Sequence, residues 1–134
     1  DFSPRMIEKA QIQATKLDIP ITVIQMDAQD MDFEDNRFDT VVTSCVFCSV
    51  PDPVLGLKEI RRVCKPGGSL IMLEHVRSDK PILGPLMDVV DPIPVRIYGA
   101  HINRKTVANI KKAGFQNIEV HDLWLDIVKL ILAH

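Results

Sequence analysis

Hydrophobic positions along the chain form helical stripes separated by short, uninterrupted apolar runs. The first stripe predicts a helix that starts at Ser3-Pro4 and ends before Pro20. The second predicts a helix that begins at Asp52 and ends at Gly67-Gly68. A third, shorter pattern, "TVANIKKAGF", predicts a helix that Gly114 stops.

The uninterrupted runs predict strands over residues 21–26, 38–47, 69–76 and 117–124. Residues 38–47 are mostly apolar, as expected for a strand buried on both faces. Residues 125–134 fit either a strand or a short helix. Alternation of helices and strands predicts an α/β fold with a mostly parallel sheet covered on both faces. Ligands of such sheets bind at the carboxyl ends of the strands, so residues just after each strand are the candidates for a site.

Composition narrows the classes of function. The 134 residues suffice for one domain, and 46% hydrophobic with 25% charged residues is typical of a soluble globular protein. A net charge of −2 provides no long-range attraction to nucleic acid or anionic lipid. No apolar run reaches the roughly 20 residues of a membrane span, and no signal-peptide pattern opens the chain. Three cysteines, an odd number, favour a reducing, cytoplasmic setting.

Cys45 and Cys48 have the spacing of a redox or zinc motif. A redox pair usually opens a helix, whereas this pair ends a predicted strand. Only Cys64, inside a helical stripe, remains as a further thiol ligand. We therefore expect small buried side chains and no metal, with a zinc or disulfide protein as an alternative that metal analysis and thiol titration would test.

Two carboxylates occupy the positions that matter most in such a sheet. Asp1 precedes the first helix, where an acidic residue often accepts hydrogen bonds from a ribose, and Asp27 ends the strand at 21–26. Asp27 there is suited to accept a hydrogen bond from an exocyclic amine. On position alone, an equally good interpretation is that both carboxylates cap turns.

Three blocks, "DFSPRMIEKA", "VIQMDAQDMDFEDNRFDTVV" and "LKEIRRVCKPGGSLIMLEHV", closely resemble class I S-adenosylmethionine-dependent methyltransferases. The nearest branch acts on small molecules and includes quinone-biosynthesis and phospholipid methyltransferases. The resemblance is specific from Asp1 to about Val76 and looser through "VANIKKAGFQNIEV". It implies a Rossmann-like sheet, mostly parallel with an antiparallel C-terminal strand, and S-adenosyl-L-methionine as cofactor.

The resemblance also implies where the cofactor lies. Asp1 would hold the ribose hydroxyls, with Phe2 beside the adenine. Asp27-Ala28 would meet the adenine edge, and Ser44-Cys45 would lie near the methionine portion. The methyl acceptor would be a small hydrophobic or amphiphilic molecule, held by a Pro-stiffened cap over about residues 77–102.

Methyl transfer needs orientation, exclusion of water and sometimes a base. His75 is the candidate base, with Glu74 expected to orient it or to bind substrate. Phe47 and His101 are further candidates for contact with the acceptor. A histidine at a strand end is nevertheless more often structural.

The family's glycine-rich loop is missing, since Gly56, Gly67 and Gly68 lie in or after a later helix. Either the chain is an N-terminally truncated fragment, which we expect, or it is a non-catalytic binding module with a degenerate fold. The expected parts are a cofactor-side half (1–76), the cap and a C-terminal part (103–134). A fragment would bind cofactor weakly and be inactive alone. Without its central strand, we expect a homodimer, a strand-exchanged assembly, or direct pairing of 21–26 with 38–47.

Overall fold

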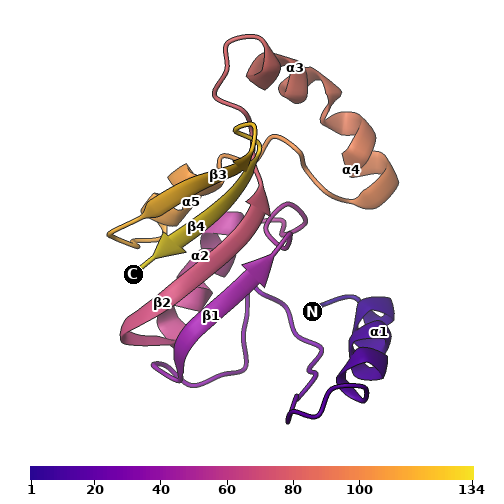
Figure 1. Ribbon diagram of the computed structural model, residues 1–134, viewed down its shortest axis with the longest axis vertical. Helices are drawn as coiled ribbons and strands as arrows, with labels where there is room; N and C mark the ends of the chain where they lie inside the picture. The colour runs from indigo at the N-terminus through magenta and orange to yellow at the C-terminus, as the bar shows by residue number, and fades with distance from the viewer.

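The computed structural model describes all of residues 1–134 (Figure 1). Five helices and four strands follow one another in the order α1 (Pro4–Ala14), β1 (Phe38–Ser44), α2 (Pro53–Val63), β2 (Cys64–His75), α3 (Leu83–Val90), α4 (Pro92–Tyr98), α5 (Thr106–Lys112), β3 (Glu119–Trp124) and β4 (Val128–Ala133).

The four strands form one sheet in the order β1-β2-β4-β3. β1 runs parallel to β2, while β4 is antiparallel to both β2 and β3. Three strands therefore point one way and only the C-terminal strand opposes them, which confirms the predicted α/β sheet. Residues 125–134, for which the sequence allowed either a strand or a short helix, form a strand.

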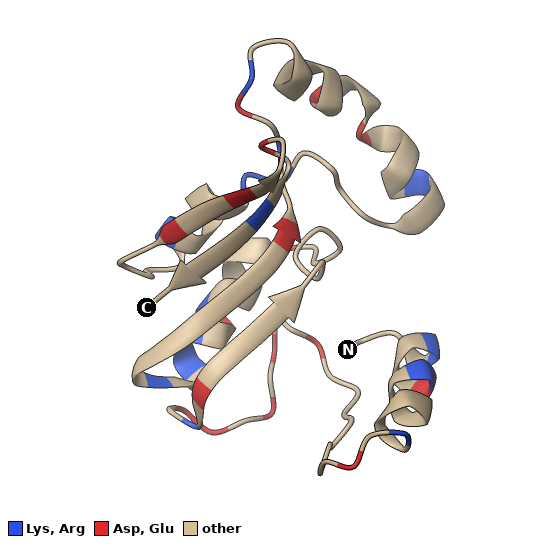
Figure 2. Cartoon of the chain, viewed as in Figure 1, with Lys and Arg blue, Asp and Glu red and all other residues tan.

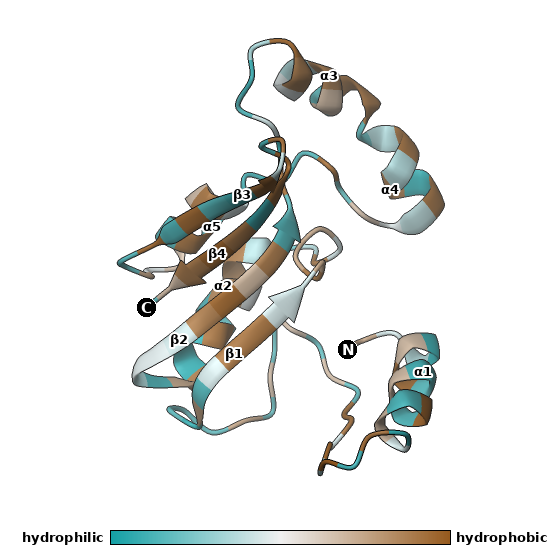
Figure 3. Ribbon diagram, in the orientation of Figure 1, coloured by the Kyte–Doolittle hydropathy of each residue, from teal (hydrophilic) through white to brown (hydrophobic).

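Helices cover one face of the sheet. Figure 1 shows α2 and α5 behind the strands, where Leu57 of α2 and Ile110 of α5 join the core with Met72 of β2. Full burial of each such side chain contributes roughly 1.5–3 kcal/mol. No helix lies against the other face in Figure 1, and Figure 3 shows apolar residues, in brown, along β1 and β2. Val42 on that face is 68% exposed. The prediction that both faces of the sheet are covered is therefore wrong, because the crossover helix α2 and α5 lie on the same side.

The N-terminal part lies beside the sheet. α1 buries none of its residues, and Figure 1 shows it apart from β1. The predicted strand at 21–26 is not formed, because its backbone bonds only to the first residues of the chain. β1 has β2 as its one partner, so the expected pairing of 21–26 with β1 is wrong and the outer edge of β1 is free.

Residues 77–102 contain two helices that were not predicted from the sequence, because the segment holds several prolines. α3 and α4 lie beyond the carboxyl ends of β1 and β2 (Figure 1). Pro85, Pro92 and Pro94 all fall in a first helical turn, where a backbone N–H has no acceptor within the helix. Prolines that read as loop residues therefore start these helices.

Candidate functional site

Asp1 and Asp27 lie on neighbouring segments at one end of the molecule. The backbone N–H of Met26 donates to the Asp1 carbonyl at 3.0 Å, which brings the two acidic residues side by side. Each carboxylate also caps the turn that follows it. Asp1 Oδ1 accepts from the Ser3 N–H at 2.8 Å, and Asp27 Oδ1 accepts from the Gln29 N–H at 2.8 Å. The turn-capping interpretation is thus correct, and Oδ2 of Asp1 remains free. Phe2, beside it, is exposed.

The turn at Asp27-Ala28 packs on the start of α2. Gln29 Oε1 accepts the Asp52 N–H at 2.8 Å. Gly56 makes this contact possible, since a Cβ there would lie 3.3 Å from the Ala28 carbonyl and 3.1 Å from the Phe47 ring. Asp27-Ala28, which we expect to contact the adenine edge, therefore packs against the residues that follow β1.

Residues 45–49, which we term the β1-tip loop, begin with a sharp change of backbone direction. Cys45 has a φ of 50°, a left-handed conformation uncommon outside glycine, and its N–H donates to the Leu73 carbonyl at 2.9 Å. Burial raises the pKa of the Cys45 thiol, and Glu74 and Cys48 raise it further. Cys48 Sγ donates to the Cys45 carbonyl. All three cysteines are free, but Cys45 is exposed and Cys48 half-buried, so the expectation that this pair is buried is wrong. No three His, Cys, Asp or Glu side chains are grouped to hold a metal ion.

The buried carboxylate of Glu74 accepts hydrogen bonds from the β1-tip loop. It is 1% exposed, and its Oε1 accepts hydrogen bonds from the Thr43 hydroxyl at 3.2 Å and the backbone N–H groups of Val46 at 3.1 Å and Phe47 at 3.5 Å. Oε2 is buried without a partner. Burial raises the pKa of Glu74, although these hydrogen bonds favour its charged form. The expectation that Glu74 orients His75 is not met, because consecutive strand residues point to opposite faces.

The two candidate histidines approach the same loop from different segments. Burial lowers the pKa of His75, partly offset by the backbone of Ile102, and its Nδ1 is buried without a partner. The His101 N–H donates to the Cys48 carbonyl at 2.9 Å. Phe47, also named from the sequence, is 1% exposed and belongs to the core beneath the loop.

Asp91 is the residue of this site that the sequence did not indicate. Its Oδ2 lies 2.7 Å from His101 Nδ1, and its Oδ1 accepts the Ile102 N–H at 2.8 Å. Asp91-Pro92 has the same form as Asp52-Pro53, which does cap its helix, whereas Asp91 makes no side-chain cap. Nothing in the spacing of Asp91 indicated a contact with a histidine ten residues later.

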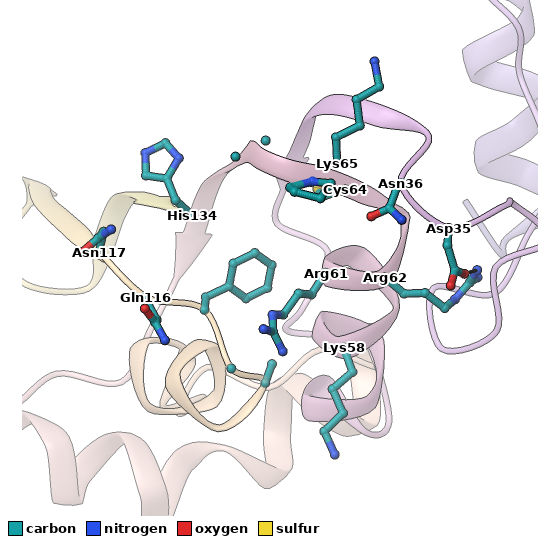
Figure 4. Close-up of a pocket in the computed structure, with 16 residues that line it drawn as sticks. Asp35, Asn36, Lys58, Arg61, Arg62, Cys64, Lys65, Gln116, Asn117 and His134 are labelled. Carbon is teal, nitrogen blue, oxygen red and sulfur yellow. Dashed lines mark hydrogen bonds and ion pairs between the residues drawn. The ribbon is translucent and has the colours of Figure 1, made fainter.

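A hollow in the surface lies away from the strand tips. An open hollow of about 680 Å³ lies at the opposite edge of the sheet, where β2 starts (Figure 4). Lys and Arg gather there on α2 and the start of β2 (Figure 2). Arg62, which points at Asp35 in Figure 4, is bonded to Asp35 at 2.7 Å and to Glu59 at 2.9 Å, and Lys65 pairs with Asp39 at 2.7 Å. Arg62 and Lys65 are thus paired, whereas Lys58 and Arg61, which also line the hollow, have no ion pair. None of the residues predicted to bind cofactor or acceptor lies in this hollow.

Comparison with known proteins identifies what the chain is similar to. Residues 1–72 match the family of methyltransferase domains. A phosphatidylethanolamine N-methyltransferase from Cereibacter sphaeroides is 37% identical over 91 residues, covering 66% of this chain and 43% of that protein. A demethylmenaquinone methyltransferase from Staphylococcus carnosus is 39% identical over 82 residues, covering 61% of this chain and 34% of that protein. The chain thus spans less than half the length of these relatives.

Solved structures share the fold. A SAM-dependent methyltransferase from Thermotoga maritima superposes with a TM-score of 0.76 at 23% identity, covering 99% of this chain and 70% of that one. Another from Aquifex aeolicus has a TM-score of 0.68 at 18% identity, covering 99% of this chain and 65% of that one. No helix has the length and hydrophobicity that crossing a membrane requires.

Proposed function

This chain belongs to the family of methyltransferase domains, and from that premise we propose that the full-length protein transfers a methyl group from S-adenosyl-L-methionine to a small hydrophobic or amphiphilic acceptor. The observation that carries the proposal is a series of contacts: Asp1 bonds to Met26 next to Asp27, and Ala28 packs with Phe47 of the β1-tip loop around Gly56. Asp1, Asp27-Ala28 and the β1-tip loop are the three parts of the chain that the family resemblance assigns to the cofactor.

The chemistry of these residues fits the proposed cofactor. Ribose hydroxyls and an exocyclic amine are donors, and the free oxygen of Asp1 and the carboxylate of Asp27 are the acceptors they require. Exposed Phe2 offers an apolar surface for a base next to Asp1. Ser44 and the left-handed Cys45 would meet the methionine portion. When bound, the cofactor supplies the electrophilic methyl group, and the protein supplies orientation and exclusion of water.

The proposed acceptor class rests on the cap and on the relatives. α3 and α4 present exposed apolar side chains at helical spacing: Ile82, Leu86, Val89, Ile93 and Ile97. The named relatives act on phosphatidylethanolamine and on demethylmenaquinone, both amphiphilic. We therefore propose a lipid headgroup or a quinone precursor as the acceptor, held between the cap and the β1-tip loop.

Calorimetry tests the proposal. The full-length gene product is expected to bind S-adenosylhomocysteine, whereas residues 1–134 alone are expected to bind it weakly or not at all. Labelled methyl transfer to phosphatidylethanolamine or to demethylmenaquinol in micelles is the second measurement. No binding by the full-length protein would overturn the proposal, and binding without transfer to any acceptor would favour a non-catalytic binding module.

The free edge of β1 leads to a separate expectation for residues 1–134. An unpaired strand edge exposes N–H and C=O groups that pair with another chain. We propose that residues 1–134 self-associate as a homodimer or a strand-exchanged assembly through β1. Sedimentation velocity is expected to show a concentration-dependent dimer, and Val42→Lys, on this strand, is expected to weaken it. A monomer at all concentrations would contradict the proposal.

A further inference from the structure

Asp91 and His101 form a fixed pair next to the β1-tip loop. Asp91 is 7% exposed, and both of its oxygens are used, one by His101 Nδ1 at 2.7 Å and one by the Ile102 N–H at 2.8 Å. The histidine backbone is fixed as well, through its N–H to the Cys48 carbonyl at 2.9 Å. Position and ring orientation are thus set by separate contacts.

The charge of Asp91 determines which ring nitrogen carries the proton. Burial opposes ionisation of Asp91, but hydrogen bonds from His101 and from the Ile102 backbone outweigh it and lower its pKa. An ionised carboxylate accepts only, so Nδ1 of the neutral ring must be the protonated nitrogen. Nε2 then carries the lone pair. The one hydrogen bond of the His101 ring is made by Nδ1, and the His101 side chain is 36% exposed.

We propose that His101 is the general base of the methyl transfer and that Asp91 is the positioning residue that keeps Nε2 free to accept a proton. This inference rests on the proposed function. The acceptor atom uses an electron pair, a lone pair on nitrogen or a π pair on a quinol ring carbon, to form its bond to the methyl carbon, while the carbon–sulfur bond breaks and leaves its electron pair on sulfur. The proton of the acceptor atom passes to Nε2, and the Asp91 carboxylate offsets the charge of the resulting imidazolium. Solvent then takes up the proton.

The acceptor class follows from this assignment. A base is needed where the methylated atom bears a proton at the moment of transfer, as an amine nitrogen or a quinol ring carbon does. His75 is the competing candidate, but its Nδ1 is buried without a partner and no carboxylate bonds to its ring. Of the ionisable groups, Asp91 bonds to the His101 ring, and Cys48 lies beside His101 through its backbone carbonyl.

A tautomer measurement tests the pair without cofactor or acceptor. In Asp91→Asn, the amide oxygen must accept the Ile102 N–H, so the amide NH₂ faces His101 Nδ1. Nδ1 must then be unprotonated, and the proton moves to Nε2, the nitrogen that has to be free. Imidazole ¹⁵N shifts of the full-length protein are expected to show Nδ1–H in the wild type and Nε2–H in Asp91→Asn. Nε2–H in the wild type would overturn the inference.

Kinetics supply the second test. His101→Asn retains a donor toward Asp91 but lacks Nε2, and it is expected to lower kcat by about 10²- to 10⁴-fold with KM and S-adenosylhomocysteine affinity unchanged. Asp91→Asn is expected to cause a loss of about the same size. Asp88→Asn is the matched control, because Asp88 on α3 pairs only with Arg77 and Asn103, and its kcat is expected to stay at the wild-type value. His75→Gln is expected to lose much less than His101→Asn.

The outcomes separate the inference from the function on which it rests. A wild-type protein that transfers methyl groups while His101→Asn retains full kcat overturns the inference and leaves the function standing. A large loss in His75→Gln with none in His101→Asn assigns the base to His75 instead. A wild-type protein that binds no S-adenosylhomocysteine overturns the proposed function itself.

Discussion

Replacing Glu74 by alanine is expected to lower the free energy of unfolding by about 3 kcal/mol. The carboxylate is the acceptor for the Thr43 hydroxyl and for the N–H groups of Val46 and Phe47. Glu74 is 1% exposed, so water has little access to the donors that its removal leaves unpaired. The cavity that this buried side chain leaves adds to the loss. Urea denaturation of the wild type and the variant measures the difference.

Glu74→Gln is the control, and its pH dependence has a definite sign. Burial raises the pKa of Glu74, so the folded state favours the neutral acid. That stabilising contribution is complete at low pH and is lost as pH rises from about 4 through the raised pKa. The stability of Glu74→Gln relative to wild type is therefore expected to increase over that interval and to remain constant above it. A relative stability that falls with rising pH would show that the ionised carboxylate is the favoured form.

Local signals predicted the central part of the fold well. β1, β2 and α2 follow from uninterrupted apolar runs and from the Asp52-Pro53 start, whose carboxylate does cap α2 through Val54 and Leu55. Sequence reasoning failed where an element depends on a partner. Residues 21–26 have strand composition, yet a strand needs a ladder beside it, and only the first residues of the chain pair with them. The Gly67-Gly68 pair, predicted to end α2, lies instead inside β2 after a helix that ends at Val63.

The sequence predicted which segments form the candidate site, but not the directions in which their side chains point. Asp27 lies against the residues after β1 although residues 21–26 form no strand, because Gln29 in the turn after it accepts the Asp52 N–H at the start of α2. The direction of a side chain depends on strand register, and the register places Glu74 toward the helices and His75 toward the open face. The Asp91–His101 contact depends on the path of the chain from α4 back to the sheet, which no local sequence pattern predicts.

Replacing Asp1 by asparagine is expected to weaken binding of S-adenosylhomocysteine to the full-length protein by about 100-fold. Asparagine can still cap the Ser3 N–H through its oxygen, so the local turn is retained. Its NH₂ group cannot accept from the ribose hydroxyls that the free Asp1 oxygen is proposed to bind. Hydrogen bonds to a charged group contribute about 1.5–3 kcal/mol each, and about 3 kcal/mol in total corresponds to about 100-fold in affinity.

Two further variants decide what such a loss means. Asp27→Asn keeps the cap to the Gln29 N–H and is expected to weaken binding by about tenfold, since one exocyclic amine is the proposed donor. Asp18→Asn, an exposed carboxylate beyond α1, changes net charge equally and is expected to leave affinity unchanged. Equal losses of affinity in Asp1→Asn and Asp18→Asn would show that the loss comes from the change in net charge and not from a contact with the ribose. Unchanged affinity in both Asp1→Asn and Asp27→Asn would contradict the placement of the nucleoside against these two carboxylates.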